Sequence, residues 1–154
     1  MFRHSLHKLL RGLVLALWGL AVQADGMSAP QINYILHCQG CHLADGSGTA
    51  GKVPALKNAA GRFLYVPGGR EYLVQVPGTA QSALTDSEVA GVLNWILLNF
   101  SETELPADFI PYSTVEISRV RPNPLADVSA ARARLMAEIS AGTRSIPTNL
   151  SGKH

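Results

Sequence analysis

The sequence predicts an all-α protein, with one small helical domain followed by a C-terminal extension. Residues 85–100 combine a capping box with apolar residues at helical spacing. Residues 28–42 begin with a plausible helix cap, and residues 130–141 are alanine-rich with apolar residues along one side. The length of 154 residues suits a single small domain plus an appendage.

The first 24 residues have the pattern of a secretory signal peptide. Arg3, Lys8 and Arg11 precede an apolar run over residues 12–22, and a small-residue cleavage site ends at Ala24. An uncleaved membrane anchor is the alternative, but eleven apolar residues fall short of the roughly 20 needed to span a bilayer. We therefore expect cleavage after Ala24, a periplasmic location and no transmembrane segment in the mature form.

Removal of this segment changes the charge of the chain. It carries three of the thirteen Lys and Arg residues and none of the eleven Asp and Glu residues, so the net charge falls from +2 to −1. A nearly neutral mature chain lacks the strongly basic face expected of nucleic-acid binding. The sequence therefore argues against a nucleic-acid partner.

The segments between the signal and residue 84 predict short elements. Ser28-Ala29-Pro30 places a cap and a proline at the start of a helix over residues 28–42. Residues 43–51 contain three glycines and indicate a turn-rich loop, and prolines and glycines in residues 52–69 interrupt any long helix. Residues 70–76 are short and mainly apolar, and the rest of the chain favours helix over strand there.

The helix over residues 85–100 is the best-supported element. The Thr85 hydroxyl can accept from the Glu88 N–H, while the Glu88 carboxylate returns to the Thr85 N–H. Gly91 inside this helix costs about 1 kcal/mol relative to alanine unless another element approaches closely there. We expect that element to be the first helix, which crosses with its Tyr34 face.

Residues 102–154 form a proline-containing connector, a helix and a tail. Four prolines make residues 102–124 an irregular connector, with a turn of helix near residues 115–120. Residues 130–141 form the last helix. This extension either packs on its own domain, which we favour, or docks the domain on a larger enzyme.

Cys38, Cys41 and His42 form the motif C-x-x-C-H, whose spacing is typical of covalent haem attachment. Each thiol can add across a haem vinyl group to form a thioether, and the adjoining imidazole can ligate the iron. A zinc site would need about four ligands, and no second cluster of Cys and His follows. A thioredoxin-like motif would follow a strand in a βαβ pattern, and a disulfide between the two cysteines is the simplest alternative. We expect one covalent haem c per chain.

Over about residues 28–100 the chain resembles the class I cytochrome c family. The matching features are Tyr34 four residues before the first cysteine, the C-x-x-C-H motif, and Gly91 and Trp95 in the capped helix. The resemblance implies a cytochrome c-like helical domain over residues 25–101 around one covalent haem. It also implies that the first and last helices of that domain cross.

The resemblance assigns a role to Pro54, twelve residues after His42. In this family the carbonyl of such a proline accepts a hydrogen bond from the haem histidine, which fixes the tautomer of the ring. A simple loop-breaking role is the alternative for Pro54.

The sequence departs from the family at the sixth iron ligand. Family members usually supply a methionine, often followed by proline, in the loop before the last helix. Here Val76-Pro77 stands at that place, and no methionine occurs between Met27 and Met136. The iron is then five-coordinate or takes another ligand, and the sixth ligand stays unknown.

Several side chains are alternatives at this position. Met136 in the extension is one, although its place on an apolar helix face favours core packing. The others are Lys52, Lys57 and Tyr72. With no such ligand, Val76 and Tyr65 are expected to line an open pocket.

Three functions follow from these patterns. The leading one is a monohaem electron carrier, not an enzyme, which passes single electrons between a periplasmic dehydrogenase and an acceptor such as an oxidase. The second is an open-site haem protein that binds small ligands as a sensor or weak catalyst. The third is a haem subunit of a larger redox enzyme.

Overall fold

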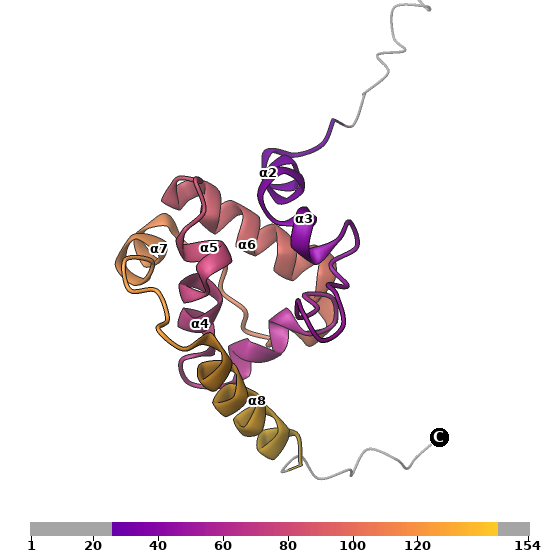
Figure 1. Ribbon diagram of the computed structural model, residues 1–154, viewed down its shortest axis with the longest axis vertical. Helices are drawn as coiled ribbons and strands as arrows, with labels where there is room; N and C mark the ends of the chain where they lie inside the picture. The colour runs from indigo at the N-terminus through magenta and orange to yellow at the C-terminus, as the bar shows by residue number, and fades with distance from the viewer. Residues whose placement is uncertain (1–25, 145–154) are drawn as a thin grey trace, which may run out of the picture.

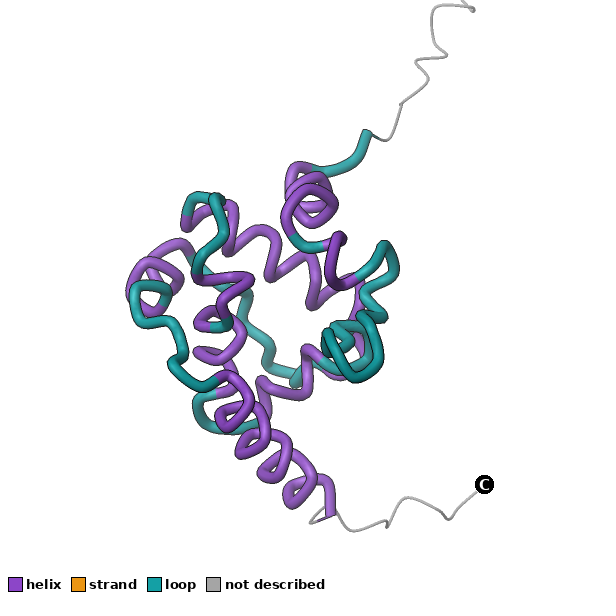
Figure 2. Tube along the Cα trace, viewed as in Figure 1, coloured by secondary structure: helices purple, strands orange, loops and turns teal. Residues whose placement is uncertain are grey.

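The computed structural model describes residues 26–144, and within them the chain is helical. The elements are α2 (Ala29–His37), α3 (Gln39–His42), the 3-10 helix η1 (Ala60–Tyr65), α4 (Gly69–Gln75), α5 (Pro77–Ala80), α6 (Asp86–Phe100), the 3-10 helix η2 (Glu102–Glu104), α7 (Thr114–Val120) and α8 (Val128–Arg144). The helices and the loop after α3 form a ring around the centre of the molecule (Figure 1). The described part holds no strand, only an isolated bridge between Thr49 and Val53, so the all-α prediction is confirmed (Figure 2).

Two of the sequence predictions concern residues outside this range. The signal peptide predicted over residues 1–24 and most of the predicted tail lie outside the described residues. Within residues 26–144, no helix is both long enough and apolar enough to cross a membrane.

Helices α2 and α6 cross, as the sequence predicts. Tyr34 of α2 is 1% exposed, and its ring lies 5.2 Å from Trp95 and 5.0 Å from Phe100, measured between ring centres. Gly91 faces Pro30 rather than Tyr34, and a Cβ there would lie 3.5 Å from the Pro30 Cγ. That is an ordinary contact distance, so the crossing does not require glycine at this position.

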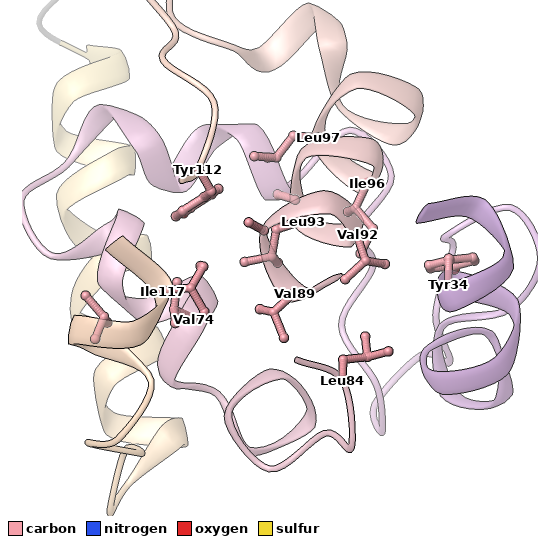
Figure 3. Packing of buried hydrophobic residues seen from close by; sticks show 13 residues of the cluster. Tyr34, Val74, Leu84, Val89, Val92, Leu93, Ile96, Leu97, Tyr112 and Ile117 are labelled. Atoms are coloured by element: carbon pink, nitrogen blue, oxygen red, sulfur yellow. The ribbon is translucent and has the colours of Figure 1, made fainter. Parts of the chain in front are cut away.

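The N-terminus of α6 is capped as predicted. The Glu88 N–H donates to the Thr85 hydroxyl at 3.3 Å, and the Thr85 N–H donates to the Glu88 carboxylate at 2.8 Å. The cap fixes the start of the helix, so that one face turns to the core. That face contributes the buried residues Val89, Ala90, Val92, Leu93, Ile96 and Leu97 (Figure 3).

The extension packs on the domain that precedes it. Tyr112, Ile117 and Val120 belong to the same buried cluster as the apolar face of α6. Leu135 of α8 is fully buried against Phe63 and Tyr72 in a second cluster. The described part of the extension therefore completes the core, as the favoured self-packing predicted.

Paired polar groups hold the extension in place as well. The Arg70 guanidinium forms two hydrogen bonds with the Glu116 carboxylate and one with the Ile110 carbonyl. It also lies 4.0 Å from the centre of the Tyr112 ring. The pKa of Arg70 is raised mainly by its hydrogen bond to Glu116, which stabilises the charged form.

Candidate cofactor site

The three residues of the C-x-x-C-H motif line one cavity. The backbone breaks at Cys38, which ends α2 and precedes the single turn of α3, and the His42 N–H donates to the Cys38 carbonyl at 3.0 Å. This turn brings Cys38, Cys41 and His42 to the same cavity, whose volume is about 300 Å³. Both thiols are free, so the simple disulfide alternative is not what the structure shows.

The His42 ring is oriented by Pro54. The ring Nδ1 lies 3.1 Å from the Pro54 carbonyl oxygen, so it is the protonated nitrogen and donates to that oxygen. Burial lowers the pKa of His42, and the Pro54 hydrogen bond opposes this shift in part. The neutral imidazole therefore has its lone pair on Nε2, the nitrogen available to a metal.

A close backbone approach positions that carbonyl. Gly48 has φ +68°, and a Cβ there would overlap the Val53 carbonyl oxygen and lie 2.7 Å from that of Pro54. Its N–H donates to the His42 carbonyl at 3.1 Å. Glycine is therefore required here, because any side chain would push the Pro54 carbonyl away from His42.

Most of the remaining cavity wall is apolar. The purely hydrocarbon lining side chains from η1, α4 and α6 are Ala60, Phe63, Leu73, Val92, Leu93, Ile96 and Leu97, and Tyr72 of α4 lines the cavity as well. An apolar wall with two thiols and one oriented imidazole fits a large flat ring that carries a metal. Among the residues that the structure describes, no cluster of three His, Cys, Asp or Glu side chains is suited to a bare metal ion.

The segment from Val76 to Ser82 closes another side of the cavity. Val76, Gly78, Thr79 and Ser82 line it, and the described lining includes no methionine. Met136 lies on α8, 37% exposed, and does not line the cavity. The structure thus places Met136 away from the site.

The other proposed ligands separate into two groups. Lys52 and Tyr72 line the cavity. Lys57 does not line it and instead lies 3.5 Å from the Asp45 carboxylate. Tyr65 is 61% exposed and donates its hydroxyl to the Leu105 carbonyl, so it does not form part of the wall expected with Val76.

Arg121, from the end of α7, secures the segment with Val76 and Ser82. Its guanidinium donates to three carbonyls, at 3.0 Å to Ala80, at 2.5 Å to Ser82 and at 2.7 Å to Leu84. It also donates to the Asp86 carboxylate at 2.9 Å. The side chain of Arg121 is 15% exposed, so these bonds are largely shielded from water.

Sequence reasoning missed the contribution of the extension to the site. Arg121 fixes one wall, and Val128 and Arg132 of α8 line the cavity. No local motif marks these residues, because their partners lie far away in the chain: those of Arg121 are 35–41 positions earlier.

The fold and this site together define a class of protein. A helical domain in which an N-terminal helix crosses a later one, with a C-x-x-C-H turn facing an apolar cavity, is a c-type cytochrome domain. Two comparisons with known proteins agree. The chain is 31% identical to a cytochrome c-552 of Thermus thermophilus over 126 residues, which cover 70% of this chain and 82% of that protein. It is 29% identical to another cytochrome c-552 of the same species over 117 residues, which cover 64% of this chain and 86% of that protein.

The chain belongs to the c-type cytochrome family. No model of a known protein family matches it. Cytochromes c carry covalently bound haem c and transfer electrons to and from redox partners, so the chain is a haem electron carrier and not an enzyme.

Proposed function

We propose that this chain is a periplasmic monohaem cytochrome c, with its haem attached through Cys38 and Cys41. Each S–H adds across one vinyl C=C, so the sulfur bonds one carbon and the hydrogen goes to the other. The single observation that carries this proposal is that both thiols and the oriented His42 ring face one apolar cavity.

The residues of the chain have separate roles in this site. His42 would ligate the iron through Nε2, and the Pro54 carbonyl keeps the opposite nitrogen protonated. The apolar side chains of α6 exclude water and lower the local polarity, which disfavours extra charge on the metal. When bound, the haem supplies one-electron redox chemistry, and the chain sets its potential and its exposure.

Export and partner are further parts of this proposal. Residues 1–24 have the pattern of a signal peptide, and a periplasmic dehydrogenase and an acceptor would exchange single electrons with the carrier. N-terminal sequencing of protein from the periplasmic fraction should begin at Asp25. Protein from membrane fractions whose sequence still begins at Met1 would contradict cleavage.

Spectroelectrochemistry tests the electron-carrier role. The purified protein should show one reversible one-electron wave with unchanged ligation over repeated cycles. The matched control is Cys38→Ala with Cys41→Ala, which removes both thiols and should lose the haem and its signal in a stringent wash. A wild-type protein that cycles irreversibly, or exchanges no electrons with any periplasmic dehydrogenase, would contradict the proposal.

The absence of methionine from the described cavity wall favours a second candidate, an open-site haem protein. With Val76 at the position expected for the ligand, the ferric protein should lack the far-red sulfur-to-iron charge-transfer band. Carbon monoxide should then bind the reduced protein rapidly. A fully low-spin reduced spectrum that does not change with carbon monoxide would eliminate this candidate.

A further inference from the structure

The cavity wall carries a tyrosine hydroxyl that has no partner among the residues that the structure describes. Tyr72 is 7% exposed and lines the cavity. Its hydroxyl makes no hydrogen bond with any residue that the structure describes, and the hydroxyl oxygen is not fully buried. A hydroxyl on the wall of a cavity, with no bond to a described residue, is free to donate to a ligand atom on the open side.

A guanidinium lines the same cavity as this hydroxyl. Arg132 of α8 is half-buried and lines the same cavity. Its central carbon is 5.5 Å from the centre of the Phe63 ring, and that ring stacks on Tyr72 at 4.9 Å. Burial raises the pKa of Tyr72, and the positive charge of Arg132 opposes the rise, as expected for neighbouring groups.

Arg132 differs from the other partly buried arginines. Arg70 pairs with Glu116, and Arg121 pairs with Asp86. Arg132 has no hydrogen bond or ion pair with a described residue, and no described carboxylate lines the cavity. The remaining titratable groups of the wall are His37, Cys38, Cys41, His42 and Lys52.

The described cavity wall therefore includes the cationic side chains of Arg132 and Lys52 and no carboxylate to balance their charge. A guanidinium that loses part of its hydration is stabilised when an anionic acceptor takes the place of water. The planar guanidinium and the phenol are both hydrogen-bond donors, and both line the space that the cofactor would fill.

We propose that Arg132 and Tyr72 form a binding site for an anionic hydrogen-bond acceptor inside the cavity. The anion is either a haem propionate carboxylate or a small external anion that enters beside the iron. The proposal rests on the haem attachment proposed above. It makes α8 a part of the cofactor site, with Arg132 and Tyr72 as positioning residues.

Two variants and two matched controls test this proposal in the full-length holoprotein. Arg132→Gln and Tyr72→Phe remove the donors. Arg134→Gln removes an arginine of the same helix that pairs with Glu138, and Tyr65→Phe removes a hydroxyl that faces away from the cavity. Intact mass is measured first, because a missing haem would reflect failure of the attachment and not of this site. Circular dichroism confirms that each variant is folded.

Two measurements then distinguish a haem propionate from an external anion: the midpoint potential of the haem and the affinity of the ferric protein for azide. If the anion is a propionate, both variants lower the potential and leave azide affinity unchanged, because the unneutralised carboxylate favours the ferric form. A tenfold change in the ratio of ferric to ferrous protein corresponds to about 59 mV. Tyr72→Phe removes no charge, so its shift reports the lost hydrogen bond alone.

If the anion is external, azide binds about tenfold more weakly to both variants, and the potential without azide stays unchanged. Equal behaviour of the two variants and their controls in both measurements would overturn the proposal.

Discussion

Replacement of Arg121 by alanine should destabilise the protein much more than replacement of an exposed arginine. The Arg121 guanidinium donates to three backbone carbonyls and to the Asp86 carboxylate, and its side chain is 15% exposed. Arg121→Ala leaves these acceptors without their donors in a region where water has limited access.

The magnitude follows from the degree of burial. Loss of one partner of a buried ion pair costs about 3–5 kcal/mol. The Asp86 side chain is 35% exposed and regains part of its hydration, which places the expected loss near the lower limit, about 3 kcal/mol. Arg121→Lys should lose roughly 1–2 kcal/mol, because an ammonium keeps the charge but not the planar set of donors.

Guanidinium chloride unfolding of the holoprotein, followed by circular dichroism, measures this loss. Arg134→Ala is the control, because the Arg134–Glu138 pair lies one helical turn apart on the surface of α8. Its removal should cost at most about 0.5 kcal/mol. Equal losses for Arg121→Ala and Arg134→Ala would refute the view that Arg121 secures the wall of the cavity.

Three more perturbations test other parts of the fold. Tyr34→Phe removes the hydroxyl that donates to the Leu43 carbonyl, and should lower the free energy of unfolding by about 1 kcal/mol in the same assay; no loss would show that water replaces this bond. Gly69→Ala places a Cβ in overlap with a carbonyl oxygen of η1 and should cost more than about 2 kcal/mol, whereas Gly40→Ala, with nothing within 4 Å, should cost far less. The capping hydrogen bonds lower the pKa of Glu88 below its usual 4.5, so its stabilisation is present above that pH and is lost as the pH falls through the lowered pKa. Melting temperatures between pH 3 and 6 should therefore fall less steeply for Glu88→Gln than for the wild type, and parallel curves would contradict this.

Local signals in the sequence predicted the elements that depend on neighbouring residues. The capping box at Thr85 and the helical spacing after it predicted α6 closely, and both hydrogen bonds of the box are present. The resemblance to the class I cytochrome c family predicted a hydrogen bond between the His42 ring and the Pro54 carbonyl, and the structure has these two atoms 3.1 Å apart. These features lie within about a dozen residues of one another, so sequence spacing determines them.

Contacts between distant segments could not be predicted in this way. The two short 3-10 helices and α5 lack strong local signals, and they form where the chain packs between α4, α6 and the extension. Arg70 pairs with Glu116, 46 positions later, and Arg121 reaches back to Asp86, 35 positions earlier. Charge patterns alone do not specify such pairs, because many arrangements of exposed charges have similar energy.

The central claim is that Cys38 and Cys41 hold one haem covalently beside His42. Intact-mass spectrometry after acid–acetone treatment tests it most directly, on mature protein from a host able to attach haem c. We expect a mass increased by one haem, which Cys38→Ala with Cys41→Ala abolishes. Wild-type protein that retains only the mass of the bare polypeptide would contradict it.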